Sequence, residues 1–174
     1  MMRKLVSGFA ASLDGFIEGP NGEYDWILIN EEMDFAEQMK RYDAFFYGRK
    51  TYEAVLKMGA GKLTDAKHYV FSRTLNAVAP GFVLIKDEVR ERVLQIKQEP
   101  GKDIALFGGA SLLAALLNFN LVDEISIAVI PVLLSRGKHM VDVLNNQVLL
   151  SLQKTYSYSN GTVQLTYTVN NKAG

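Results

Sequence analysis

The sequence of 174 residues contains no cysteine, which excludes disulfides, thiolate nucleophiles and cysteine-ligated metal sites. It has only two histidines, His68 and His139, and no cluster of carboxylates accompanies them, so we expect no metal site. No apolar run approaches the roughly 20 residues that a membrane-spanning helix requires. The polar residues Ser12 and Asp14 interrupt the N-terminal segment before it reaches the length of a secretion signal. We therefore expect a cytoplasmic protein that neither binds a metal nor enters a membrane.

An excess of charge is also missing, because 19 Lys and Arg residues balance 19 Asp and Glu residues. This balance gives no reason to expect nucleic acid or an anionic membrane as a partner. The composition, with 48% hydrophobic and 22% charged residues, is close to that of an average globular domain. The length suits one domain, and no internal repeat or linker divides it. We therefore expect a single domain that spans residues 1–174.

What the sequence does contain is an alternation of apolar runs and helix-forming segments over its first three quarters. Apolar runs and turn residues predict strands at 5–11, 44–47, 68–72, 82–85, 104–107, 124–130, 149–158 and 162–169. Helices are expected after an N-cap at Asn30, at about 50–57, from a cap at Asp87 to about 98, and at 110–117. The dipeptide Asn160-Gly161 favours a hairpin between the last two strands. This order predicts an α/β fold with a central, mainly parallel, eight-stranded sheet, a C-terminal antiparallel hairpin and about four flanking helices.

The sharpest local feature is Gly108-Gly109-Ala110-Ser111, which lies between an apolar strand and a helix. Successive glycines let the backbone approach a ligand closely. The free N–H groups at the start of the following helix then favour an anion such as a pyrophosphate. A tight strand-to-helix turn without any ligand is the alternative interpretation of the same four residues.

Two other predicted strands also end in polar, phosphate-competent residues. One is followed by Gly48, Arg49, Lys50 and Thr51, and the next by Ser72 and Arg73. Open α/β sheets bind ligands at the carboxyl ends of their strands, so these residues are expected to meet the glycine turn. Cations rather than carboxylates suit the 2′-phosphate of NADP. Taken singly, each of these cations could equally be ordinary solvated surface.

The glycine-rich fingerprint of the common dinucleotide-binding fold is missing after the first strand. That strand instead ends in the run Ala10 to Ile17, which reads AASLDGFI. A nicotinamide cofactor would therefore have to be held by another fold.

Four ordered motifs supply that other fold. The run Ala11 to Ile17 resembles the first-strand motif of the dihydrofolate-reductase-like superfamily, in the branch of the riboflavin-biosynthesis deaminase-reductase. The segments Gly48 to Glu53, Phe71 to Arg73 and Phe107 to Ser111 resemble its 2′-phosphate, adenosine and pyrophosphate motifs. The resemblance covers nearly the whole chain and implies NADPH-dependent reduction and a homodimer. It also implies that Ala10, Ala11 and Leu13 lie beside the nicotinamide.

Hydride transfer requires no protein nucleophile, but a proton donor can be needed at the reduced centre. Dihydrofolate reductases use a carboxylate on the first helix, and this chain offers Glu31, Glu32 or Asp34 there. We select Asp34 as the catalytic and substrate-binding candidate, because it shares a helix face with Gln38 and Arg41. A solvated helix face is the alternative.

Two further residues are candidates for binding the substrate, Asp14 and Trp26. A simple Asp-Gly turn is the alternative for Asp14. An aromatic side chain in the core or in a lid is the alternative for Trp26.

The substrate is left open. A phosphorylated ribosylamino-pyrimidine, as for 5-amino-6-(5-phosphoribosylamino)uracil reductase, and a pteridine are both compatible with the resemblance. Without cysteine, the chain lacks the zinc deaminase motifs of the bifunctional enzymes, so only a reductase part is present. A hydrolase is disfavoured, because Leu113 stands where a nucleophile elbow requires glycine. A non-catalytic NADP-binding module is the remaining alternative.

Overall fold

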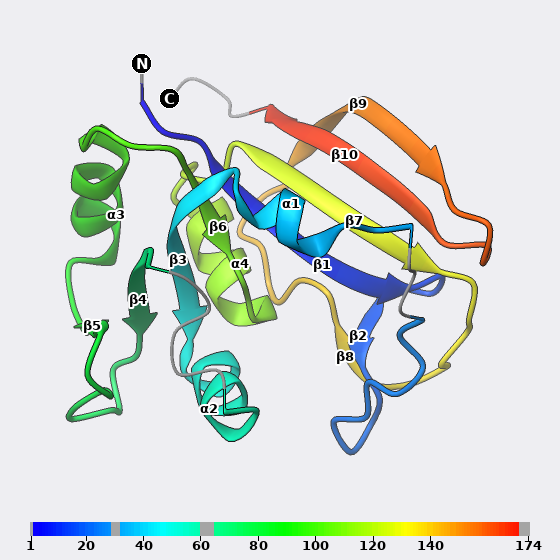
Figure 1. The fold of residues 1–174 in the computed structure, drawn as a ribbon, viewed down its shortest axis with the longest axis horizontal. Helices are drawn as coiled ribbons and strands as arrows, with labels where there is room; N and C mark the ends of the chain where they lie inside the picture. Colours follow the sequence, from blue (N-terminus) through cyan, green and yellow to red (C-terminus); the bar gives the residue numbers. More distant parts are fainter. Residues whose placement is uncertain (1, 29–31, 60–64, 171–174) are drawn as a thin grey trace.

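A computed structural model describes residues 2–28, 32–59 and 65–170, so Asn30 and Glu31 lie outside the described part. Its centre is an eight-stranded twisted sheet (Figure 1). The spatial order of strands is β5 (Phe82–Ile85), β4 (Lys67–Phe71), β3 (Tyr42–Gly48), β6 (Asp103–Leu106), β1 (Leu5–Ser12), β7 (Glu124–Ile130), β10 (Val163–Asn170) and β9 (Leu149–Ser157). The first six strands are parallel, and β10 and β9 continue the sheet antiparallel. The predicted fold class is confirmed.

A second, two-stranded sheet was not predicted. It pairs β2 (Phe16–Glu18) with β8 (Lys138–His139), and the ring of Phe16 stacks on that of His139 at 4.7 Å. Both strands are too short to show an alternating pattern, and about 120 residues separate them along the chain. This small sheet lies below the carboxyl end of β1, so it carries β8 toward the glycine turn (Figure 1).

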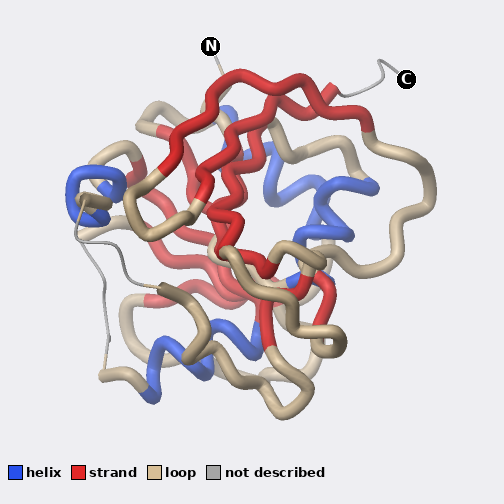
Figure 2. Tube along the Cα trace, turned by 90° about the vertical axis from the view of Figure 1, so that its right-hand side faces the viewer, coloured by secondary structure: helices blue, strands red, loops and turns tan. Residues whose placement is uncertain are grey.

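In the described part of the chain, four helices cover the two faces of the sheet (Figure 2). They are α1 (Phe35–Met39), α2 (Arg49–Lys57), α3 (Val89–Gln98) and α4 (Ala110–Asn118). Helices α3 and α4 bury Val93, Ile96 and Leu113 against one face of the sheet, while α2 buries Tyr52 and Val55 against the other. The buried strands are continuous apolar runs, which is the pattern of a sheet covered on both sides. No helix in the described part of the chain is long and apolar enough to cross a membrane.

Two helix starts differ from the sequence-based expectations. Helix α1 begins at Phe35, and Asp34 is its N-cap. Asn30, the expected cap, lies outside the described residues. Helix α3 begins at Val89 with Glu88 as N-cap in a left-handed conformation, without a side-chain cap. The prediction of Asp87 as this cap was therefore wrong by one residue, and the turn is made by the backbone rather than by a carboxylate.

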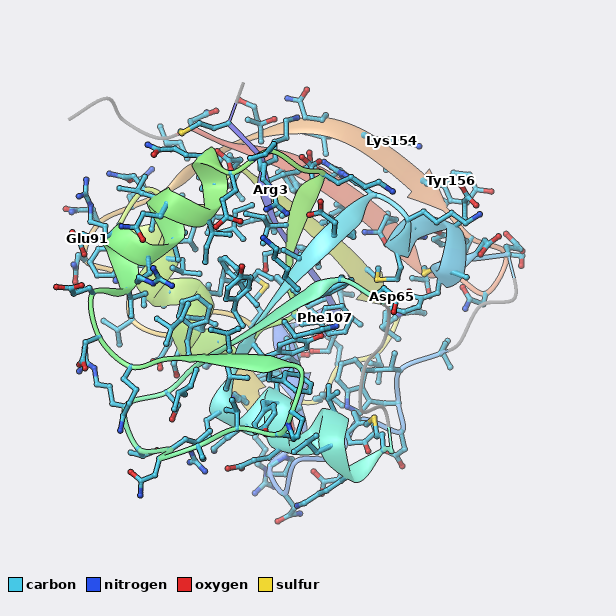
Figure 3. All side chains as sticks on the ribbon, turned by 60° about the vertical axis from the view of Figure 1, so that its left-hand side comes forward. Arg3, Asp65, Glu91, Phe107, Lys154 and Tyr156 are labelled. Carbon is cyan, nitrogen blue, oxygen red and sulfur yellow. The ribbon has the colours of Figure 1, made fainter. Side chains whose placement is uncertain are left out.

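Ion pairs are concentrated where the parallel strands begin. Arg3 is buried and pairs with Asp43, and Figure 3 places Arg3 near the start of β1. The buried Lys97 pairs with Asp123 at 2.5 Å and donates to the carbonyl of Leu121 at 2.8 Å. The amino end of the sheet is thus fixed by buried charges that have partners within the chain.

The same end carries an Arg41 network. Its guanidinium spans both carboxylate oxygens of Glu124, at 2.7 and 3.1 Å, and contacts Asp103 at 2.8 Å. These hydrogen bonds raise the pKa of Arg41. A planar guanidinium that holds a carboxylate through two bonds is a rigid cross-link between strands.

Candidate functional site

One cavity, here called the polar cavity, opens at the carboxyl ends of β3, β4, β5 and β6 and has a volume of about 970 Å³. Ligand sites of parallel α/β sheets lie at this end of the strands. Eight of the predicted cofactor residues line it: Gly48, Arg49, Lys50, Thr51, Ser72, Arg73, Gly109 and Ser111. The structure therefore brings together three motifs that are far apart in the sequence.

The glycine turn lies directly against the end of β3. The Gly48 N–H donates to the carbonyl of Gly108 at 2.7 Å, and the peptide bond between Gly108 and Gly109 is cis. A Cβ on Gly48 would lie 3.3 Å from that carbonyl oxygen and 3.4 Å from the nitrogen of Gly109. Gly108 adopts a φ of +99°, a conformation that other residues rarely take. Gly48 thus leaves room for the close approach of the two chain segments, and Gly108 supplies the left-handed conformation of the turn.

Three helices begin at the polar cavity. Helix α2 starts after Gly48, α4 after Gly109 and α3 after Glu88, and none of them has a side-chain hydrogen bond at its N-cap. The first N–H groups of a helix lack partners within the helix and carry the positive end of its dipole. Residues from the first turn of each helix, such as Thr51, Arg90 and Ser111, line the cavity. This arrangement favours a ligand with several anionic groups.

The charges around the polar cavity lead to the same conclusion. Six cationic and three acidic side chains line it, an excess of three positive charges in a protein whose overall net charge is zero. Arg49 pairs with Glu53 at 2.9 Å. Lys50, Arg73 and Lys86, by contrast, form no ion pair with any residue that the structure describes. Such cations are available to a ligand.

Lys138 is a cationic residue that sequence reasoning missed. It comes from β8, lines the polar cavity, and its Nζ lies 3.5 Å from where a Cβ on Gly109 would stand. Its ion pair with Glu18 is long, at 3.9 Å. No local motif surrounds Lys138, so only the pairing of β2 with β8 could have placed it beside the glycine turn.

Two predicted hydroxyls also hold neighbouring loops. The hydroxyl of Ser111 donates to the Asp142 carboxylate at 2.8 Å, and this bond lowers the pKa of Asp142. The Ser72 hydroxyl accepts from the N–H groups of Thr74 and Leu75, both at 3.2 Å. Ser72 and Ser111 therefore shape the walls of the polar cavity in addition to lining it.

The second cavity, here called the apolar cavity, has a volume of about 480 Å³ and lies between α1 and the sheet. Its walls are mostly apolar or aromatic, with Leu28, Phe35 and Phe107 among them, and carry a few neutral polar side chains. Phe107 is partly buried and packs against the aromatic cluster of β3, as its ring contacts with Phe45 and Tyr47 show (labelled in Figure 3). Because Phe107 lines this cavity and Gly109 lines the polar one, the two cavities approach each other on either side of Gly108.

Small residues from adjacent strands form the floor of the apolar cavity. Gly8 pairs with Ser126 and Ala10 pairs with Ala128 across β1 and β7, while Ala105 of β6 completes the floor. A Cβ added to Gly8 would meet no atom within 4 Å, so there is open space above it. A floor without large side chains allows a flat ring to lie against the sheet. Among the three predicted nicotinamide neighbours, Ala10 lines this cavity.

The other two neighbours lie elsewhere. Ala11 is buried, and Leu13 is 65% exposed, with its N–H donating to the carbonyl of Val132 at 2.9 Å. Neither residue lines the two cavities. The same holds for Gly108 and Ala110, which stand at the glycine turn between them.

The substrate candidates Asp14 and Trp26 are engaged by nearby loops. Asp14 accepts hydrogen bonds from the Ser12 hydroxyl at 2.6 Å and from the N–H groups of Leu134 and Ser135 at 3.1 and 2.8 Å. These bonds, led by that of Ser12, lower the pKa of Asp14. The Trp26 indole N–H donates to the carbonyl of Glu23 at 3.1 Å. Neither side chain lines the apolar cavity, although Ile27, next to Trp26, does.

The predicted helix face around Asp34 is divided in the structure. Gln38 lines the apolar cavity, Arg41 belongs to the network at the amino end of the sheet, and Asp34 accepts from the Glu37 N–H at 2.8 Å. The Glu32 carboxylate accepts a hydrogen bond from the Ser159 hydroxyl. Glu31, the third candidate proton donor, lies outside the described residues.

Known proteins resemble this chain in sequence and in fold. The family model of the RibD C-terminal domain matches residues 3–164. The uncharacterized protein YyaP of Bacillus subtilis (strain 168) is 36% identical over 177 residues, which cover 95% of this chain and 94% of YyaP.

Two solved structures illustrate the fold. One, from Shewanella sp. PV-4, is of a protein named for riboflavin biosynthesis, with a TM-score of 0.85, 24% identity and coverage of 98% of this chain and 99% of that one. The other is dihydrofolate reductase from Enterococcus faecalis, complexed with NADP(H) and RAB-propyl, with a TM-score of 0.73, 18% identity and coverage of 98% and 99%. The fold is therefore dihydrofolate-reductase-like, and the chain belongs to the family of the RibD C-terminal (reductase) domain.

Proposed function

We propose that this protein is an NADPH-dependent reductase of a small heterocyclic metabolite. One observation carries the proposal: a cationic cavity with three helix N-termini adjoins an apolar cavity whose floor accepts a flat ring. The first suits the phosphates of a dinucleotide, and the second suits a nicotinamide together with a ring that receives its hydride. NADPH supplies that hydride when it is bound.

The residues that line the polar cavity fit the cofactor part by part. Arg49, Lys50 and Arg73 are proposed to hold the 2′-phosphate, because they are cations at the ends of β3 and β4. The start of α4, with Gly109, Ala110 and Ser111, is proposed to hold the pyrophosphate. Thr51 and Lys138 flank that turn, since both lie within 4 Å of a Cβ placed on Gly109.

The protein itself contributes binding, orientation and the exclusion of water. Ala10 and the small residues beside it are proposed to support the nicotinamide ring, and α1 covers the substrate from the other side. A ring held between these two surfaces is placed for transfer without any movement of the sheet. Hydride transfer needs no protein nucleophile, and no described residue of this cavity is a cysteine, lysine or carboxylate.

A titration with NADPH and NADH, followed by cofactor fluorescence, tests the polar cavity. We expect NADPH to bind more tightly, and Lys50→Ala to weaken NADPH binding about tenfold, the effect of losing one charged contact of about 1.4 kcal/mol. Lys154→Ala is the matched control, because Lys154 is an exposed cation on β9, far from the site (Figure 3). Equal binding of both cofactors, or equal effects of the two variants, would contradict the assignment.

Asp34 is retained as the proposed proton donor, and its position sets a condition. Its carboxylate caps α1 and must turn from the Glu37 N–H to reach the apolar cavity. Asp34→Asn is a selective test, because asparagine caps helices as well as aspartate does. We expect lower turnover with unchanged NADPH affinity and unchanged unfolding. Unchanged turnover would remove Asp34 from the mechanism.

The same binding and turnover assays separate the reductase from one alternative function. A protein that binds NADPH but consumes none with a panel of pteridines and aminopyrimidines would be a non-catalytic binding module.

The homodimer implied by the resemblance is also a proposal. It is supported by exposed apolar side chains on the edge strand β9: Leu149, Leu150, Leu152 and Tyr156. Light scattering measures the molar mass in solution and so distinguishes a dimer from a monomer.

A further inference from the structure

A pair of neutral polar side chains stands at the edge of the apolar cavity. The Gln164 amide Nε2 donates to the hydroxyl oxygen of Ser126 at 2.8 Å, and both residues line the cavity. This bond leaves one hydrogen-bond donor and one acceptor of the pair without a partner in the described structure. The Ser126 hydroxyl can still donate its hydrogen, and the Gln164 carbonyl oxygen can still accept one. The pair therefore presents one donor and one acceptor side by side.

The register of the sheet places this pair next to the floor of small residues. Gln164 of β10 lies beside Ala128 of β7, which lies beside Ala10 of β1. Ser126 lies beside Gly8. A flat ring lying on the floor formed by Gly8, Ala10 and Ala128 would thus turn its edge toward Gln164 and Ser126.

Thr162 adds a third polar function on the same side. It precedes β10, lines the apolar cavity and is 1% exposed. Its hydroxyl has no hydrogen-bond partner within the described part of the chain. A buried hydroxyl without a partner is costly, because it has lost its water and gained nothing in return. A ligand that brings a polar atom to this side of the cavity would remove that cost.

The rest of the described lining favours an uncharged ligand. None of the nineteen described residues around the apolar cavity is charged. Burial raises the pKa of Tyr42, one of them, so its hydroxyl also stays neutral. The nearby Arg41 is already held by Glu124 and Asp103. A phosphate group buried here would have no cation to replace its water, which makes its binding unfavourable.

We propose that the apolar cavity binds a flat, uncharged heterocycle by a lactam edge, an adjacent ring N–H and C=O, and that it does not take a phosphorylated substrate. The lactam N–H donates to the Gln164 carbonyl oxygen, and the lactam C=O accepts from the Ser126 hydroxyl. This inference rests on the proposed reductase function and names its class of substrate. Among the candidates left open by the sequence, it selects a pteridine-like ring over the phosphorylated ribosylamino-pyrimidine.

The test uses three probes, titrated calorimetrically into the full-length protein with and without NADP⁺. They are lumazine, 1,3-dimethyllumazine, in which both lactam nitrogens are methylated, and 5-amino-6-(5-phosphoribosylamino)uracil. We expect lumazine to bind at least tenfold more tightly than either of the others. Tighter or equal binding of the phosphorylated probe, equal binding of the methylated probe, or no binding of lumazine would overturn the proposal.

Variants locate the binding. Gln164→Met should weaken lumazine binding about tenfold without changing NADPH affinity. Gln153→Met is the matched control, because Gln153 lies on the exposed strand β9 and should change neither. Thr162→Val removes only the unpartnered hydroxyl, so it should fold normally and weaken lumazine binding several-fold. Lumazine binding that both cavity variants leave intact would refute the assignment. If the wild-type protein does not bind NADPH, the proposed function is rejected instead. The proposal for the apolar cavity can still be tested in that case, because lumazine binding is also measured without cofactor.

Discussion

The two ends of the parallel sheet both carry many charged side chains, but these charges have different partners. At the amino end, Arg3 pairs with Asp43, Lys97 with Asp123, and Arg41 with Glu124. At the carboxyl end, the polar cavity collects an excess of positive charge. Its cations Lys50, Arg73 and Lys86 form no ion pair with a described residue.

This difference separates stability from binding. A buried ion pair is costly to break, because removing one partner leaves an uncompensated charge in a medium of low polarity. An exposed cation without a partner contributes little to folding but attracts an anion that enters the cavity. We infer that the amino end holds the sheet together and that the carboxyl end is kept available for a ligand.

The largest expected effect is on folding, from the amino end. Lys97→Met removes the buried ammonium and its two hydrogen bonds, and should lower the free energy of unfolding by about 2–3 kcal/mol, because the Asp123 carboxylate left behind is 32% exposed. Urea denaturation measures this, and NADPH affinity should not change in the folded fraction. Lys67→Met is the control, since its pair with Glu99 is exposed and should contribute at most about 1 kcal/mol. Similar losses in both variants would refute the distinction between buried and exposed pairs.

The sequence predicts the carboxyl end better than the amino end, for a physical reason. The proposed ligand-binding strand ends are local motifs. Gly48 to Thr51 is marked by a glycine with adjacent cations and Gly108 to Ser111 by two successive glycines, and the structure brings the two segments together. The amino-end pairs join residues such as Lys97 and Asp123, whose partnership depends on how distant segments pack. Neither residue type nor spacing along the chain encodes that contact.

The same reasoning explains which parts of the candidate site were missed. Lys138 reaches the glycine turn only because β8 pairs with β2. The floor of the apolar cavity is visible in the sequence only as small residues at alternate positions, Gly8 and Ala10 in one strand and Ser126 and Ala128 in another. Their alignment across two strands requires the register, which a single strand does not specify.

A second, smaller effect is expected from salt. Raising the ionic strength from about 0.05 M to about 0.5 M shortens the screening length, so NADPH binding at the exposed cations of the polar cavity should weaken several-fold. The free energy of unfolding should change much less, because the cations Arg3 and Lys97 are buried and held within direct contact of their carboxylate partners. Fluorescence titration and urea denaturation at both salt concentrations give the two quantities. Cofactor binding that does not respond to salt would argue against electrostatic capture at this end.

The smallest effect concerns a carboxylate near the carboxyl end of β1 that binds the chain rather than a ligand. The bonds that Asp14 accepts from Ser12, Leu134 and Ser135 lower its pKa below the ordinary value of 3.8. A carboxylate whose pKa is lower in the folded state stabilises that state when the pH is above its ordinary pKa. This contribution is lost as the pH falls through the lower pKa of the folded state. Asp14→Asn should therefore melt at a lower temperature than the wild type at neutral pH, and the gap should close in acid. The exposed Asp25→Asn should show no such closing gap. If the difference in melting temperature between the wild type and Asp14→Asn persists unchanged well below pH 3.8, the side chain acts by its shape alone. The charge of Asp14 would then not contribute to folding.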